Sequence, residues 1–120
     1  MKILIAEDER LMRKTICMKL EKEGYTVDSC VDGKEALQKL EEGFPDIVIT
    51  DIMLPYASGL EILQFVKKRN SLTAVIVLSA LGQEKTVEDA FELGADDYIT
   101  KPFNLNELAV RVKRLLKKNH

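Results

Sequence analysis

The chain has 120 residues, of which 46% are hydrophobic, and this is enough for the core of one domain and too many for a disordered chain. We therefore expect a single domain over residues 1–120. Its 18 basic and 20 acidic residues leave a formal net charge of −2, so the composition indicates no polyanionic partner. The longest apolar run, residues 74–78, is too short to span a membrane, and no signal peptide is indicated. We expect a cytoplasmic protein with no membrane partner.

The histidine and cysteine content excludes several kinds of catalytic and metal site. The only histidine is His120, so a histidine-based triad or a histidine-bearing zinc site is not expected. Cys17 and Cys30 lack the spacing of metal ligands, and we expect them to be reduced thiols without a disulfide.

Five short segments rich in isoleucine, valine and leucine are predicted to be strands. The first, third and fourth are continuous apolar runs, which are typical of central strands in a parallel sheet covered on both faces. The second and fifth are more mixed, as edge strands can be. The five segments are Lys2–Ala6, Tyr25–Cys30, Asp46–Thr50, Ala74–Leu78 and Ala95–Ile99.

Helical spacing fills the stretches between and after these strands. Met12, Ile16 and Leu20 lie on one face of the first helix, and Leu108, Val112 and Leu115 on one face of the last. Three helices begin with a capping box, in which a short polar residue and a glutamate three residues later satisfy free N–H groups. The boxes are Asp32/Glu35, Ser58/Glu61 and Asn104/Glu107, and the expected helix ends are Gly24, Gly43 and Gly94.

This alternation predicts an α/β fold, a single (βα)5 doubly wound parallel sheet with helices on both faces. Ligands of such sheets bind outside the carboxyl ends of the strands. The residues that follow the predicted strands are Glu7 and Asp8, then Asp51, then Ser79, and finally Lys101. Three carboxylates, one hydroxyl and one ammonium group are therefore expected at one edge.

The three carboxylates repel one another, and each pair at ~5 Å costs about 3 kcal/mol at an effective dielectric of ~20. Mg²⁺ relieves this repulsion, and together with a hydroxyl and a lysine it suits a phosphoryl group. Each residue alone has an ordinary explanation: residues 7–9 could start a helix, and Asp51, Ser79 and Lys101 could be solvated loop residues. Their coincidence at one edge favours a site.

Four segments of the chain resemble the motifs of two-component response-regulator receiver domains. They are ILIAEDE at 3–9, DIVITDIMLPYASG at 46–59, VIVLSA at 75–80 and GADDYITKPF at 94–103. The last, with Glu107 and Arg111, is closest to the branch that carries a C-terminal winged-helix DNA-binding domain. The resemblance implies a flavodoxin-like fold with strand order 2-1-3-4-5.

By this resemblance Asp51 is the phosphate acceptor, and Glu7 and Asp8 bind Mg²⁺ together with Asp51 and the main-chain carbonyl of Met53. Lys101 would contact the phosphate. The remaining implied residues are the switch hydroxyl Ser79, the switch aromatic Tyr98 and Pro102, whose bond to Lys101 would be cis.

The implied function is a phosphorylation-controlled signalling switch. A sensor histidine kinase would donate the phosphoryl group, and the chain would catalyse only its own phosphorylation and dephosphorylation. DNA would be contacted only through an output domain that this chain does not contain, unless the protein is a stand-alone receiver. Two different functions compete with this interpretation. One is a small Mg²⁺-dependent phosphatase or phosphotransferase with an aspartate nucleophile, and the second is a binding module that does not depend on phosphorylation.

Two further expectations follow from the resemblance. Met53 and Leu81 flank the solvent approach to the phosphoryl group and are apolar here, so dephosphorylation should be slow. Phosphorylation should promote a two-fold homodimer, weakened because Val87 stands where the branch has a basic partner for Glu107. Its pairs would join Asp97 to Arg111 and Asp96 to Lys113.

Overall fold

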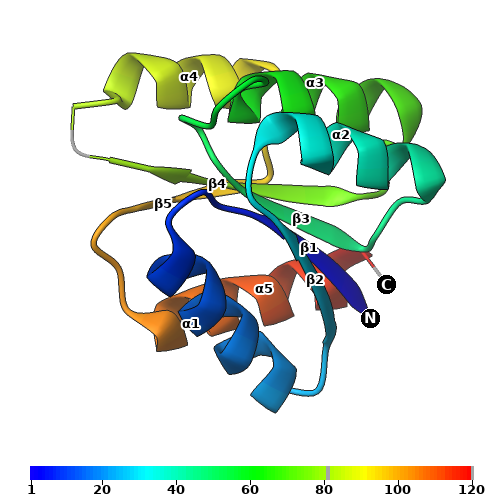
Figure 1. Cartoon of the computed structure of the whole chain (residues 1–120), viewed down its shortest axis with the longest axis vertical. Coiled ribbons are helices and arrows are strands. Elements are labelled where there is room, and N and C mark those ends of the chain that lie inside the picture. The colour runs from blue at the N-terminus through cyan, green and yellow to red at the C-terminus, as the bar shows by residue number, and fades with distance from the viewer. Residues whose placement is uncertain (81, 120) are drawn as a thin grey trace.

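The computed structural model describes residues 1–80 and 82–119, and it alternates five strands with five helices (Figure 1). The strands are β1 (Lys2–Ala6), β2 (Thr26–Cys30), β3 (Ile47–Asp51), β4 (Ala74–Ser79) and β5 (Asp97–Thr100). The helices are α1 (Arg10–Lys22), α2 (Gly33–Glu42), α3 (Gly59–Arg69), α4 (Glu84–Glu92) and α5 (Leu105–Asn119).

All neighbouring strands are parallel, and their order is β2-β1-β3-β4-β5. The predicted fold class and strand order are therefore confirmed. Strand ends differ from the prediction by one or two residues. β3 and β4 extend to Asp51 and Ser79, while β5 begins only at Asp97, because the Ala95 N–H still closes the end of α4 by donating to the Ala90 carbonyl. β5 is an edge strand held by β4 alone.

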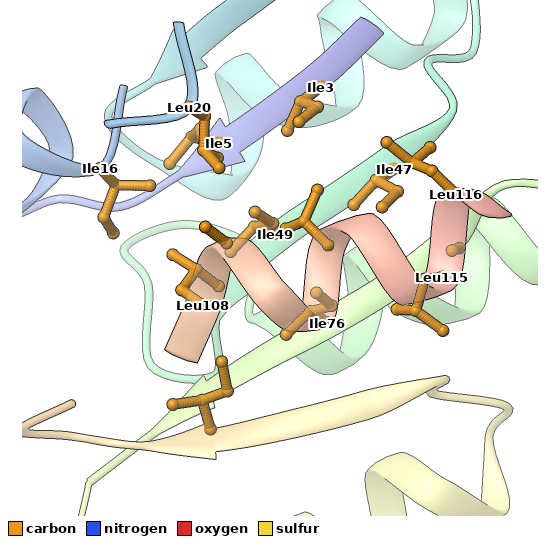
Figure 2. Packing of buried hydrophobic residues seen from close by; sticks show 14 of the residues in the cluster. Ile3, Ile5, Ile16, Leu20, Ile47, Ile49, Ile76, Leu108, Leu115 and Leu116 are labelled. Carbon is orange, nitrogen blue, oxygen red and sulfur yellow. The ribbon is translucent and has the colours of Figure 1, made fainter. Parts of the chain in front are cut away.

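The core is divided by the sheet into two apolar layers, one on each face. Helices α1 and α5 cover one face, and α2, α3 and α4 cover the other (Figure 1). Figure 2 shows Ile5, Ile49 and Ile76 from three adjacent strands packing toward Leu20 of α1 and Leu108 of α5. Every residue of β3 and β4 is buried, as expected for continuous apolar runs.

The helix starts agree with the predicted caps at two positions and differ at the third. Asp32 and Ser58 each accept a hydrogen bond from the backbone N–H three residues later. Asn104 instead accepts from the Asn106 N–H at 2.7 Å, two residues later. This bond takes the place of the predicted bond from the Glu107 N–H. At the other ends, α1, α2 and α4 are followed by the predicted glycines: Gly24, Gly43 and Gly94.

Two of the sequence-based exclusions can be compared with the structure. Cys17 and Cys30 are both free thiols, as predicted. None of the helices in residues 1–80 and 82–119 is long and apolar enough to cross a bilayer.

Candidate functional site

The carboxyl ends of β1, β3, β4 and β5 meet at one edge of the sheet, where the sequence predicted a site. Backbone hydrogen bonds hold the chain together just beyond the strands. The Ile52 N–H donates to the Leu78 carbonyl at 3.0 Å, and the Lys101 N–H donates to the Ser79 carbonyl at 2.6 Å. The sheet register therefore brings Asp51, Ser79 and Lys101 into adjacent positions, as predicted.

Three carboxylates gather at this edge. Oxygen atoms of Glu7, Asp8 and Asp51 all lie within 4.8 Å of one another. Glu7 is fully buried and Asp51 is 9% exposed, whereas Asp8 is exposed to solvent. Burial raises the pKa of Glu7, and the nearby charge of Asp51 adds to this rise, while hydrogen bonding to Lys101 opposes it. Hard oxygen donors at this separation fit the ligand preferences of Mg²⁺.

Lys101 supplies the positive charge of the site. Its Nζ lies 2.8 Å from Asp51 Oδ2 and 2.5 Å from Glu7 Oε1. Burial opposes the charged form of this lysine, but hydrogen bonds to Asp51 and Glu7 raise its pKa overall, so the side chain stays cationic. The Lys101–Pro102 bond is cis, as the resemblance implied.

The acidic run at residues 7–9 divides between the site and the helix. Glu7 and Asp8 belong to the carboxylate cluster. Glu9 instead caps α1, because its side chain accepts from the backbone N–H groups of Leu11 and Met12. The run therefore contributes two residues to the carboxylate cluster and one to the start of α1.

The loop between β3 and α3 is tightly folded around Asp51. The Gly59 N–H donates to the Ile52 carbonyl at 2.8 Å, which brings the start of α3 back to the end of β3. A Cβ atom on Gly59 would lie 2.3 Å from the carbonyl oxygen of Asp51, so only glycine fits. Met53, in the same loop, is 66% exposed. Leu81, its predicted counterpart beside the phosphoryl group, lies outside the described residues.

The same loop contains a strained turn centred on Tyr56. Its φ is +72°, and the Ala57 N–H donates to the Pro55 carbonyl at 2.9 Å, which together define a γ-turn of the rare, strained form. The Pro55 carbonyl also accepts from the Gly33 N–H at 3.1 Å, at the start of α2. The turn is therefore anchored to a neighbouring helix while the Tyr56 side chain is 83% exposed.

Ser79 and Tyr98 both line a pocket of about 390 Å³. Ser79 is buried, with 1% exposure, whereas Tyr98 is 38% exposed and packs edge-on against Phe91 with ring centroids 5.5 Å apart. Val87 of α4 and Thr100 of β5 also line this pocket. The space beside Ser79 is open, and the Tyr98 ring lies toward the surface.

Comparison with known proteins agrees with this geometry. Residues 3–113 match the sequence model of the family described as the response regulator receiver domain. The chain belongs to this receiver family. Receiver domains are phosphorylation-controlled switches of two-component signalling, and this chain is a regulatory domain of that kind.

Curated relatives of this receiver are regulators about twice as long. Response regulator RR06 of Streptococcus pneumoniae is 42% identical over 118 residues, which are 98% of this chain and 54% of that protein. The transcriptional regulatory protein ResD of Bacillus subtilis is 38% identical over 117 residues, covering 98% and 48%. The phosphate regulon transcriptional regulatory protein PhoB of Escherichia coli is 40% identical over 122 residues, covering 98% and 52%. The receiver spans about half the length of these relatives.

Solved structures with the same fold include isolated receivers. The Francisella response regulator 1452 receiver domain superposes with a TM-score of 0.91 at 37% identity, covering 99% of this chain and 98% of that one. A receiver domain protein from Clostridium thermocellum gives a TM-score of 0.91 at 31% identity, covering 98% and 94%.

Three of the residues predicted at the receiver dimer interface, Asp97, Glu107 and Arg111, form ion pairs within this chain. Asp97, 8% exposed, accepts from Arg111 Nη1 at 2.8 Å and from Arg114 Nη2 at 3.0 Å. Glu107 accepts from Arg111 Nη2 at 2.9 Å. The sequence prediction did not include Arg114, although its position three residues after Arg111 places it on the same side of α5.

Asp96 and Lys113, the second pair predicted across the dimer, lie in different surroundings within this chain. Asp96 Oδ2 accepts from Lys67 Nζ at 2.9 Å and from the Val75 N–H at 2.8 Å, so this carboxylate fastens α3 and β4 together. Lys113 lines surface hollows beside Tyr25. A pair between Asp96 and Lys113 of a second chain stays a prediction.

Proposed function

We propose that this receiver accepts a phosphoryl group on Asp51 from a phosphohistidine of a sensor kinase. The observation that carries the proposal is the position of Asp51 between two further carboxylates and the ammonium group of Lys101, 2.8 Å away. A carboxylate so placed can act as a nucleophile while a nearby cation neutralises the transferring oxygens. The domain would catalyse its own phosphorylation and dephosphorylation and no other reaction.

Mg²⁺ fits the acidic cluster, and we propose that Glu7, Asp8 and Asp51 hold it together with the main-chain carbonyl of Met53. The fit rests on the separation of the carboxylate oxygens and on their hard donor character. When bound, the ion would relieve carboxylate repulsion and neutralise phosphoryl charge. Asp8 is the exposed member of the cluster and is open to solvent from which an ion would enter.

The transfer itself requires little more than positioning. A carboxylate oxygen of Asp51 would attack the phosphorus atom in line with the phosphorus–nitrogen bond of the donor. That bond would break with its electron pair passing to the imidazole, which leaves as neutral histidine once it has gained a proton from solvent. Lys101 would stabilise the negative oxygens of the phosphoryl group throughout.

The proposed response to phosphorylation involves Ser79 and Tyr98. The Ser79 hydroxyl would donate to a phosphoryl oxygen, and the Tyr98 ring would move from its contact with Phe91 into the pocket beside Ser79. This change would alter the surface formed by α4, β5 and α5, which presents the receiver to its partners.

Partners of the whole protein are proposed from its relatives. ResD and PhoB are named as transcriptional regulatory proteins, and the receiver covers about half of each. We propose that it controls an output domain that acts on transcription in the cytoplasm, with DNA contacted only by that domain. A phosphorylation-promoted homodimer would serve this control.

Phosphorylation with a small donor tests the assignment of Asp51. Incubation with acetyl phosphate and Mg²⁺ should add one phosphoryl group, detected by intact mass spectrometry, and Asp51→Asn should abolish the addition. Asp28→Asn, which neutralises an exposed carboxylate on β2, is the matched control and should be labelled like wild type. Equal labelling of the Asp51→Asn protein would show that the acceptor is elsewhere. Turnover of a panel of phosphate esters would instead indicate a phosphatase.

A further inference from the structure

The side chain of Gln83 contacts the backbone at the carboxyl end of β4. Its Oε1 accepts a hydrogen bond from the Ala80 N–H at 2.6 Å. Gln83 is also the residue that precedes α4, and its side chain makes no capping bond to that helix. The Gln83 side chain therefore binds Ala80 and not an N–H group of the first turn of α4.

The alternation of β4 indicates which way the Ala80 N–H points. In a strand, the N–H and carbonyl of one residue point to the same neighbour, and those of the next residue to the opposite neighbour. The Leu78 carbonyl accepts from Ile52, just after β3, and the Ser79 carbonyl accepts from Lys101, just after β5. The N–H of Ala80 therefore continues on the β3 side, the side on which Asp51 ends its strand.

A phosphoryl group on Asp51 would need hydrogen-bond donors on this side. Asp51 pairs with Leu78 in the sheet, and Ala80 is two residues beyond, just after β4, so its N–H is the next donor that faces the acceptor strand. Ser79, between the two, is buried against the same edge. The Gln83 amide thus occupies a donor that the phosphorylated state would use.

We propose that Gln83 competes with the phosphoryl group on Asp51 for the N–H of Ala80, and that phosphorylation releases the Gln83 side chain toward the start of α4. This inference rests on the proposed function of Asp51. The phosphoryl oxygen carries negative charge, so its hydrogen bond to the N–H is stronger than that of a neutral amide, and the exchange runs in the direction of release. No covalent bond changes in this step.

Release of Gln83 would connect the phosphorylation site to α4 directly. The freed amide lies one residue before Glu84, where its oxygen can accept from an N–H of the first helical turn. Gln83 also lines the pocket beside Ser79 and Tyr98, so its departure from Ala80 changes the same space into which the tyrosine would move. Gln83 is thus a positioning residue for the response, not a catalytic one.

The cost of displacing Gln83 can be measured with beryllium fluoride and Mg²⁺, which mimic the phosphoryl group. Gln83→Met keeps the length of the side chain and removes the competing oxygen, and Gln83→Ala removes the side chain. Both should bind the mimic about two- to tenfold more tightly than wild type, the range for one net hydrogen bond. Binding is followed by calorimetry. Glu88→Ala, a truncation on an exposed residue of α4 that lines the same pocket, should stay within about twofold of wild type.

A second readout follows the Ala80 amide itself. In wild type without the mimic, its proton should exchange with solvent slowly, and exchange should accelerate in Gln83→Met without unfolding elsewhere. A purely structural role for Gln83 predicts equal or weaker binding of the mimic in both variants, and that result would overturn the inference. If wild type binds no mimic at all, or if Asp51→Asn binds it equally, the proposed function fails, and not merely the competition.

Discussion

Gly59 lies so close to Asp51 that a Cβ atom on the glycine would be 2.3 Å from the Asp51 carbonyl oxygen. The first turn of α3 therefore packs directly on the end of the strand that carries the candidate acceptor. The Gly59 N–H reinforces this packing through its hydrogen bond to Ile52. The position of the Asp51 carboxylate thus depends on the absence of a side chain eight residues later in the chain.

Gly59→Ala should destabilise the protein by about 2 kcal/mol or more, because the added methyl group must displace backbone atoms rather than a flexible side chain. Urea denaturation followed by circular dichroism measures the change in free energy of unfolding. Gly43→Ala is the matched control, since no atom lies within 4 Å of a Cβ there, and it should change stability by less than about 0.5 kcal/mol. Equal changes in the free energy of unfolding for the two substitutions would show that the close approach of Gly59 to Asp51 does not limit stability.

Asp8→Asn should weaken the stabilisation that Mg²⁺ gives, because a neutral amide replaces a charged ligand. At a concentration of about 100 times its dissociation constant, Mg²⁺ should raise the free energy of unfolding of wild type by about 2.7 kcal/mol. The Mg²⁺-free stability should rise in the variant, since the neutral amide no longer repels Glu7 and Asp51. Thermal unfolding with EDTA and with Mg²⁺ separates the two effects, and Glu21→Gln serves as the surface control. An undiminished Mg²⁺ effect in Asp8→Asn would exclude this residue as a ligand.

Cys30 should make the folded protein less stable at alkaline pH. Burial raises the pKa of its thiol to about 12, from the usual value of 9.0. Between these values the unfolded chain releases the proton and the folded chain keeps it, so stability falls as pH rises above 9. At pH 10 the expected loss is about 1.4 kcal/mol.

The Cys30→Ala variant isolates this contribution from those of other groups that lose protons at alkaline pH. Urea denaturation at pH 8 and pH 10 should show a smaller loss in the variant than in wild type. Iodoacetamide at pH 8 should leave Cys30 unmodified until the protein is unfolded, because the thiol is 1% exposed. Ready modification of Cys30 in the native protein, identified by peptide mass mapping, would contradict its buried position.

Arg111→Glu should prevent the dimer that phosphorylation is expected to promote. In the single chain Arg111 already binds Asp97, so dimerisation would exchange this contact for the same contact with a second molecule. Two rim ion pairs contribute about 0.2–1 kcal/mol each, but reversing the charge also creates repulsion with Asp97. Light scattering with beryllium fluoride and Mg²⁺ measures the mass.

Arg114→Ala provides the matched control for this experiment. Arg114 binds the second oxygen of the same Asp97 carboxylate but has no place in the predicted intermolecular pair. The Arg114→Ala protein should therefore dimerise at least as well as wild type. A dimer that tolerates Arg111→Glu, or a wild-type receiver that stays monomeric at high concentration with the mimic, would refute the predicted interface.

The main features of the site could be predicted because they depend on where strands end. A continuous apolar run followed by Asp51, and another followed by Ser79, indicate buried parallel strands whose carboxyl ends meet at one edge. The division of the acidic run was open in the sequence, since Glu7 and Glu9 are chemically alike. Only the geometry of the turn into α1 decides that Glu7 is buried and Glu9 caps the helix.

Contacts that depend on loop conformation could not be predicted. The bond from Ala80 to Gln83 requires the chain to turn after β4, and a glutamine in that place is compatible with many turns. The pairing of Asp97 with both Arg111 and Arg114 depends on the distance between β5 and α5. The Asn104 side chain accepts from the N–H two residues later rather than three. The spacing of residues in the sequence does not distinguish between these two turns.

Because β5 lies at the edge of the sheet, it is less rigid than β3, another strand that carries a residue of the proposed switch. β3, which carries Asp51, is hydrogen-bonded to β1 on one side and to β4 on the opposite side, and is therefore stiff. β5, which carries Tyr98, is joined to the sheet by a single ladder of four residue pairs and can shift without parting from a second neighbour. Phosphorylation of Asp51 on the rigid strand β3 would therefore displace the less constrained strand β5, where a binding partner can detect the change.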